Sequence, residues 1–74
     1  MNVLLFGVLT DVAGKSKLEI KAADVDSLKE ILLNQFPDLN KYKFQFAVNK
    51  EIVEQNIPLN EGDEIALLPP YAGG

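Results

Sequence analysis

Residues 24–37 have the sequence DVDSLKEILLNQFP, and this stretch carries the strongest helix signal of the chain. Asp24 is a suitable N-cap, because its carboxylate can accept hydrogen bonds from the free amides of the first turn. Pro37 predicts that the helix ends near Phe36. Apolar residues recur between these limits at spacings of three and four, which predicts one amphipathic helix with a single face to bury: Val25, Leu28, Ile31, Leu32 and Phe36.

On the N-terminal side of the helix, the pattern is that of β-strands. Residues 3–9 are rich in β-forming residues. Residues 17–22 alternate through Leu18 and Ile20, and the segment around Gly14 supplies a turn between the two runs. We expect these two segments to form a hairpin.

On the C-terminal side, residues 44–48 alternate before a turn at 49–50, and the apolar pair 52–53 follows. This order predicts a second, shorter hairpin. Leu59 is expected to hold the next loop against the core. Residues 61–63 are expected to form the turn before the last strand, and Gly62 can take a positive φ there.

The last predicted strand, residues 65–68, is almost entirely apolar, which is typical of a central strand paired in parallel with the first strand. We therefore expect an α+β fold, in which a mixed sheet of four to five strands carries one main helix on one face. Residues 1–68 would form this domain, and residues 69–74 an extended C-terminal tail.

The two-residue period of the central strands predicts which side chains lie under the helix. Val3, Leu5, Ile65 and Leu67 should face it, which leaves a second apolar set on the opposite face: Leu4, Phe6, Ala66 and Leu68. Because no further helix is predicted to cover this face, we interpret the set as a partner interface. The alternative is that strand twist and loops cover these side chains within the domain.

Composition excludes several classes of function. The 74 residues, 47% hydrophobic and 24% charged, are enough for one small globular domain. The chain has no Cys and no His, which excludes disulfides, thiolate nucleophiles and nearly all zinc sites. Seven lysines among eleven carboxylates, with a net charge of -4, argue against nucleic-acid binding. No segment approaches the roughly 20 apolar residues of a membrane span, so we expect a cytoplasmic protein that does not bind membranes.

The sequence closes with a stiff segment and two glycines. Pro69 and Pro70 favour an extended backbone, because their φ is fixed and they lack amide hydrogens. Gly73 and Gly74 have no side chains, so they could pass through a narrow channel and present a carboxylate in another protein's active site. The alternatives are a strand terminator and a solvated chain end.

These residues resemble a known family. The order Gly62-Asp63-Glu64, Pro69-Pro70 and Gly73-Gly74 is similar to the C-terminal signature of molybdopterin synthase small subunits, which are ubiquitin-like β-grasp sulfur carriers. The start agrees, because VLLFG at 3–7 followed by VAG at 12–14 resembles the first strand and glycine turn of that family. The resemblance covers the whole chain. It departs at Tyr71, where small aliphatic residues are common, and at Leu67-Leu68, where aromatic residues are common.

The resemblance implies a chemical cycle on Gly74. An adenylating enzyme related to the ubiquitin activators would use ATP to activate the Gly74 carboxylate, and a sulfur donor protein would convert it to a thiocarboxylate. The tail would then enter the large subunit of molybdopterin synthase and donate sulfur to a cyclic pyranopterin phosphate. Two donations build the dithiolene of molybdopterin. On this basis the chain itself binds no cofactor, Gly74 is the reactive position, and five residues insert with it: Pro69, Pro70, Tyr71, Ala72 and Gly73.

Side chains for autonomous catalysis are missing from the sequence. Asp63 and Glu64 are adjacent, so in a strand they point to opposite faces and cannot share an acid–base site. No Ser–His or Cys–His pair is possible, so catalytic groups must come from a partner.

Two other functions stay open at this stage. One is a related sulfur carrier for thiamin thiazole synthesis or tRNA thiolation, against which Pro69-Pro70 and the long predicted first strand argue. The other is a β-grasp binding module whose tail is chemically idle.

Overall fold

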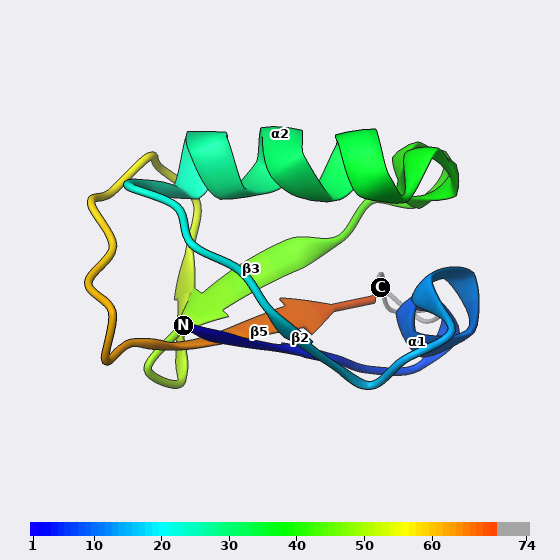
Figure 1. The fold of residues 1–74 in the computed structure, drawn as a ribbon, viewed down its shortest axis with the longest axis horizontal. Helices are drawn as coiled ribbons and strands as arrows, with labels where there is room; N and C mark the ends of the chain where they lie inside the picture. Colours follow the sequence, from blue (N-terminus) through cyan, green and yellow to red (C-terminus); the bar gives the residue numbers. More distant parts are fainter. Residues whose placement is uncertain (70–74) are drawn as a thin grey trace.

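The structure, a computed structural model, describes residues 1–69. Among them the elements follow in the order β1 (Asn2–Leu5), α1 (Val8–Ala13), β2 (Lys17–Glu19), α2 (Val25–Gln35), the 3-10 helix η1 (Pro37–Lys41), β3 (Gln45–Val48), β4 (Glu51–Val53) and β5 (Glu64–Leu68). The five strands form one sheet in the order β2-β1-β5-β3-β4, and α2 lies across one face of it (Figure 1). The predicted α+β fold with one main helix is confirmed.

The centre of the sheet is the parallel pair β1 and β5. Val3 pairs with Ile65 and Leu5 with Leu67, and all four side chains are buried. The remaining neighbours, β1–β2, β3–β5 and β3–β4, are antiparallel. The four buried side chains of β1 and β5 belong to one apolar cluster with the fully buried helix residues Leu28 and Leu32. The prediction of which residues lie under the helix is confirmed.

The limits of α2 are those that the sequence predicts. The Asp24 carboxylate accepts a hydrogen bond of 2.8 Å from the Ser27 amide, so it caps the first turn. At the other end, the Phe36 amide donates to the Leu32 carbonyl over 2.8 Å. Pro37 then begins η1 instead of continuing α2.

The prediction of a strand over residues 3–9 was wrong in its second half. β1 ends at Leu5, and residues 8–13 form the short helix α1 between Gly7, which has a φ of 58°, and Gly14, which has a φ of 74°. Both glycines adopt a backbone region that L-residues rarely occupy, so each can turn the chain at one end of α1. β1 and β2 do pair antiparallel, but α1 and not a tight turn connects them.

The predicted turn before β5 is present, but it does not use the positive φ that Gly62 allows. The turn at residues 60–63 closes with a hydrogen bond of 3.0 Å from the Asp63 amide to the Asn60 carbonyl, and Gly62 does not have a positive φ. A type I turn needs no such residue. The two non-glycine residues with positive φ, among those described, are Asn49 and Lys50 at the predicted β3–β4 turn.

The long connection from β4 to β5 is held at two backbone positions. The Leu59 amide donates to the Ala23 carbonyl over 2.8 Å, and the Val25 amide donates to the Ile57 carbonyl over 3.1 Å. The Leu59 side chain is buried, as predicted.

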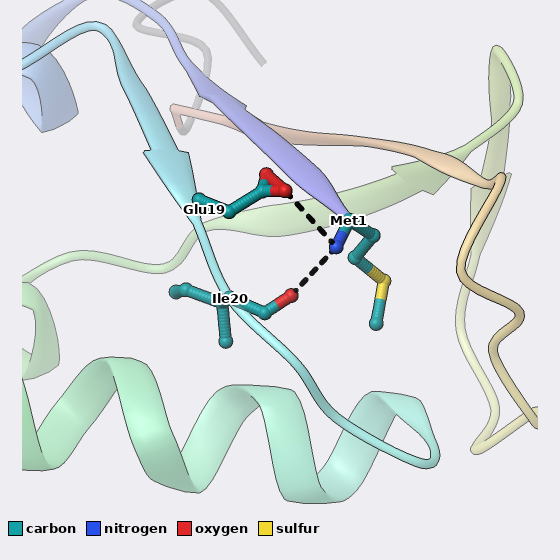
Figure 2. Close-up of polar contacts among 3 residues, drawn as sticks. All are labelled: Met1, Glu19 and Ile20. Atoms are coloured by element: carbon teal, nitrogen blue, oxygen red, sulfur yellow. Dashed lines mark hydrogen bonds and ion pairs between the residues drawn. The ribbon is translucent and has the colours of Figure 1, made fainter.

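The start of β1 is tied to the edge strand β2. Figure 2 shows the Met1 amine donating a hydrogen bond of 3.0 Å to the Ile20 carbonyl, with Glu19 Oε1 3.8 Å away. The Ile20 amide in turn donates to the Met1 carbonyl over 3.1 Å. These contacts extend the β1–β2 pairing beyond the ends of the two strands.

Among residues 1–69, no helix combines the length and hydrophobicity needed to cross a bilayer. The division into a domain over 1–68 and a tail over 69–74 stays a prediction, because all but the first tail residue lie outside the described part of the chain.

Candidate functional site

The four residues predicted as a partner interface lie together on the sheet face opposite α2, which we call the open face. Leu4 in β1 is directly paired with Ala66 in β5, and Leu68 follows two positions later on the same face. Phe6 comes immediately after the end of β1, next to this end of β5. The register of the central parallel pair therefore brings the predicted set into one patch.

Water reaches this patch unevenly. Phe6 is 46% exposed, whereas Leu4, Ala66 and Leu68 are half-buried by their neighbours in the sheet. The alternative in which loops cover the whole set therefore does not hold for Phe6. An exposed aromatic ring beside half-buried aliphatic side chains is a suitable anchor for a protein interface.

Ile52 in β4 belongs to the same face, and sequence reasoning missed it. Cross-strand pairing places Leu4 beside Ala66, Ala66 beside Ala47, and Ala47 beside Ile52, so these side chains form one row across the sheet. Ile52 is 51% exposed. The turn at residues 49–50 could have placed Ile52 on this face, because the register of a hairpin with a two-residue turn decides towards which face each β4 side chain points.

The open face becomes acidic towards the start of the central strands. Asn2 pairs with Glu19 on one side and with Glu64 on the other, and both carboxylates are exposed. Apolar groups thus gather near the end of β5, and negative charge gathers near its start. A partner that covers the whole face would meet both regions.

Asp63 has a structural role and is not part of an acid–base pair. One carboxylate oxygen accepts from the Asn60 amide (2.8 Å) and the other from Asn49 Nδ2 (3.0 Å). These hydrogen bonds, first the one from the Asn60 backbone and then the one from Asn49, hold the pKa of Asp63 below its ordinary value of 3.8. Glu64 is exposed at the first position of β5, so the two carboxylates do not form a shared site, as predicted.

Of the six residues predicted to form the tail, the structure describes only Pro69. Its side chain is half-buried, and its ring lies close to the backbone of Gly7. The predicted reactive residue Gly74 and the predicted insertion residues Pro70, Tyr71, Ala72 and Gly73 lie outside the described residues.

Three comparisons relate this geometry to known proteins. Residues 3–74 match the ThiS family. The molybdopterin synthase sulfur carrier subunit of Mycobacterium tuberculosis is 34% identical over 80 residues, which cover 100% of this chain and 96% of that protein. The match is therefore not confined to a motif at one end.

Solved structures agree with the fold. SAMP1 from Haloferax volcanii has a TM-score of 0.81 at 26% identity, over 99% of this chain and 97% of that one. In the protein–protein complex of subunits 1 and 2 of the molybdopterin-converting factor from Helicobacter pylori, one chain has a TM-score of 0.75 at 33% identity, over 99% of this chain and 96% of that one. The domain therefore has the ubiquitin-like β-grasp fold, and the chain belongs to the ThiS family.

Proposed function

We propose that this chain is the sulfur carrier subunit of a molybdopterin synthase and that the carboxylate of Gly74 carries the sulfur. The observation that carries the proposal is the full-length similarity to the sulfur carrier subunit of Mycobacterium tuberculosis, together with the sequence Gly73-Gly74 at the end of a β-grasp domain. An exposed apolar face beside the last strand supports it, because a carrier must dock on the enzyme that it supplies.

The proposed chemistry begins with activation, because a carboxylate is a poor electrophile. In the active site of an adenylating enzyme, a Gly74 oxygen attacks the α-phosphorus of ATP and pyrophosphate leaves. Hydrosulfide released by a donor protein then attacks the acyl carbon, AMP leaves and a proton is lost, so the carboxylate becomes a thiocarboxylate. ATP is consumed by the activating enzyme, and the carrier itself holds no cofactor. Because the cycle depends on ATP, a cytoplasmic location is part of the proposal.

The second half of the cycle takes place on the large subunit. The thiocarboxylate sulfur attacks a carbon of the cyclic pyranopterin precursor, and a carbon–oxygen bond at that carbon breaks, so that sulfur replaces oxygen there. Water then attacks the acyl carbon of Gly74 and breaks the acyl–sulfur bond, which leaves the sulfur on the pterin and returns Gly74 to a carboxylate. Two carriers supply the two sulfurs of the dithiolene. Catalytic side chains come from the large subunit, because the carrier has neither Cys nor His.

Docking on the large subunit is assigned to the open face. Phe6 and Ile52 supply exposed apolar surface, and the half-buried Leu4, Ala66 and Leu68 lie between them. The Helicobacter pylori neighbour is solved as a complex of subunits 1 and 2 of its molybdopterin-converting factor, which supports a heteromeric assembly here.

Mass spectrometry of the intact chain tests this proposal. After incubation with the activating enzyme, ATP and a sulfur donor, we expect the mass gain that replacement of one oxygen by sulfur produces, located on Gly74 by fragmentation. A reaction without ATP is the control. An unchanged mass in the complete reaction would favour a binding module with an idle tail.

The acceptor separates this function from that of related sulfur carriers. The long first strand that the sequence predicted does not distinguish the two kinds of carrier, because β1 ends at Leu5. The thiocarboxylated chain, mixed with the large subunit and the cyclic pyranopterin precursor, should yield molybdopterin. A loaded carrier that transfers sulfur only to a thiazole precursor or to tRNA would replace the proposed acceptor.

A further inference from the structure

Gly7 makes an unusually close approach to the residue at which the C-terminal segment leaves the sheet. A Cβ atom placed on Gly7 would lie 3.0 Å from Cγ of Pro69, 3.6 Å from its Cβ and 4.0 Å from its Cδ. The optimal separation of two carbon atoms is about 3.5–4.0 Å, so a side chain at residue 7 would press on the proline ring. Gly14 and Gly62 have no atom within 4 Å of an added Cβ.

The register of the central strands explains why these two residues meet. The last parallel pair is Leu5 with Leu67, and Gly7 and Pro69 each lie two positions after this pair, just beyond the ends of β1 and β5. Pro69 has no amide hydrogen, so the ladder cannot continue through it. Its ring instead packs on the backbone of Gly7.

The backbone at residue 7 is itself held in place by the start of α1. The Thr10 amide donates to the Gly7 carbonyl over 3.1 Å, and the Thr10 hydroxyl donates to the Leu5 carbonyl over 3.0 Å. Gly7 has a φ of 58° and a ψ of −136°, a combination that is open essentially to glycine alone. The chain therefore has two separate reasons for glycine here: the turn into α1, and the space that Pro69 occupies.

We propose that Gly7 is a positioning residue for sulfur transfer. Because residue 7 has no side chain, the Pro69 ring can pack against its backbone. This contact fixes where, and in which direction, the chain leaves the sheet after β5. Phe6 is adjacent to Gly7 and is exposed on the open face. The contact between Gly7 and Pro69 therefore also fixes the position of Pro69 relative to the proposed docking surface. This inference rests on the proposed function and assigns to the turn between β1 and α1 a part in sulfur transfer.

Glycine substitutions at the two ends of α1 separate positioning from backbone strain. Gly7→Val and Gly14→Val both place a side chain at a positive φ, although ψ is −136° at Gly7 and 10° at Gly14, and only residue 7 has Pro69 as a neighbour. A Pro69→Gly background therefore separates strain at residue 7 from contact with the ring. Gly7→Ala is the milder member of the series and keeps the test possible if Gly7→Val does not fold. Each full-length variant is prepared as the thiocarboxylate, and its rate of sulfur transfer is measured against carrier concentration with the large subunit.

For Gly7→Val we expect the KM for the carrier to rise about tenfold while kcat changes little, because a misdirected segment enters the large subunit less often. For Gly14→Val we expect KM to stay within about twofold of wild type, even where urea shows a similar loss of stability. In a Pro69→Gly background, Gly7→Val should have no further effect on KM, because the ring on which it acts is gone.

A structural measurement does not depend on activity. Wild-type chain should show nuclear Overhauser effects between the α protons of Gly7 and the ring protons of Pro69, and Gly7→Ala should weaken them. Absence of these signals from wild type would overturn the inference, as would equal KM values for Gly7→Val and Gly14→Val. Failure of wild type to transfer any sulfur is a different result, because it would remove the proposed function itself and this inference with it.

Discussion

Phe6 and Ile52 are the two large apolar side chains that are most exposed among residues 1–69, at 46% and 51%. They lie at opposite sides of the open face, Phe6 at the end of β1 and Ile52 on the edge strand β4. Neither contributes much to the core, so a change at either position should act on binding more than on folding.

Phe6→Asp and Ile52→Asp are therefore expected to weaken binding of the large subunit by more than about 2 kcal/mol if these residues anchor the interface. The free energy of unfolding should change by only about 0.5 kcal/mol. Calorimetric titration and urea unfolding measure the two quantities. Asn34→Asp, on the exposed side of α2, adds the same charge away from the open face and is the control. Equal losses in binding and folding would show that these side chains serve the core.

Asp24 and Asp63 link stability to pH. Hydrogen bonds to the charged carboxylates, first from the Ser27 backbone for Asp24 and from the Asn60 backbone for Asp63, lower both pKa values below 3.8. A lowered folded-state pKa means that the stabilisation is fully present above 3.8 and is lost as the pH falls through the folded-state pKa.

For wild type we therefore expect the free energy of unfolding to fall as the pH drops below the ordinary carboxyl pKa of 3.8. Asp63→Asn should be less stable at neutral pH, because its amide has one acceptor oxygen where the carboxylate uses two. Its free energy of unfolding should fall less on acidification, because an amide side chain does not take up a proton. Urea unfolding at a series of pH values measures both effects. Parallel curves for wild type and Asp63→Asn would contradict this assignment.

At the scale of elements, the β3–β4 turn holds the start of β5 in place. Asn49 Oδ1 accepts from the Glu64 amide over 3.0 Å, its Nδ2 donates to Asp63, and its own amide donates to the Glu64 carbonyl over 2.8 Å. A residue of one hairpin thus sets the entry to the central strand that leads to the C-terminal segment. Asn tolerates the left-handed backbone conformation that this turn requires.

Asn49→Gly and Lys50→Gly form a matched pair, because both residues have positive φ, 51° and 72° respectively. Asn49→Gly should cost about 1 kcal/mol of stability, since it keeps the backbone conformation accessible but removes both side-chain hydrogen bonds. Lys50→Gly removes no such bond, relieves a left-handed lysine, and should not lower stability. Thermal or urea unfolding decides between them, and an equal loss in both would show that the two hydrogen bonds contribute nothing measurable.

At the scale of the whole molecule, the residues that stabilise the fold are different from those proposed to dock and to transfer sulfur. The core gathers between α2 and the sheet face that α2 covers, whereas the proposed docking residues lie on the opposite face. Figure 1 shows α2 on one side of the sheet. Stability and sulfur transfer should therefore be separable by mutation.

Deletion of Gly74 tests that separation. We expect it to abolish both loading with sulfur and transfer, because the reactive carboxylate is displaced by one residue, while the urea midpoint stays unchanged. Deletion of Gly74 that leaves loading intact would show that the reactive carboxylate is not tied to this position.

The sequence by itself determined those features that depend on local pattern. α2 was predicted from its apolar spacing, its cap at Asp24 and its stop at Pro37, because helix limits depend on near neighbours. The inward and outward faces of β1 and β5 followed from the period of two, once the two strands were paired. The signature residues at 62–64 and 69–74 likewise indicated the family that the comparisons then showed.

Only the tertiary structure decided the rest. A six-residue segment is too short for its hydrophobic period to distinguish a helix from a β-strand. Only the structure therefore shows α1, in which Leu9 is fully buried. Ile52 joined the open face through a register that the chain fixes across four strands. The contact of Gly7 with Pro69 joins residues 62 positions apart, and it exists because β1 and β5 are parallel and their pairing stops at Leu5 and Leu67, which no local pattern encodes.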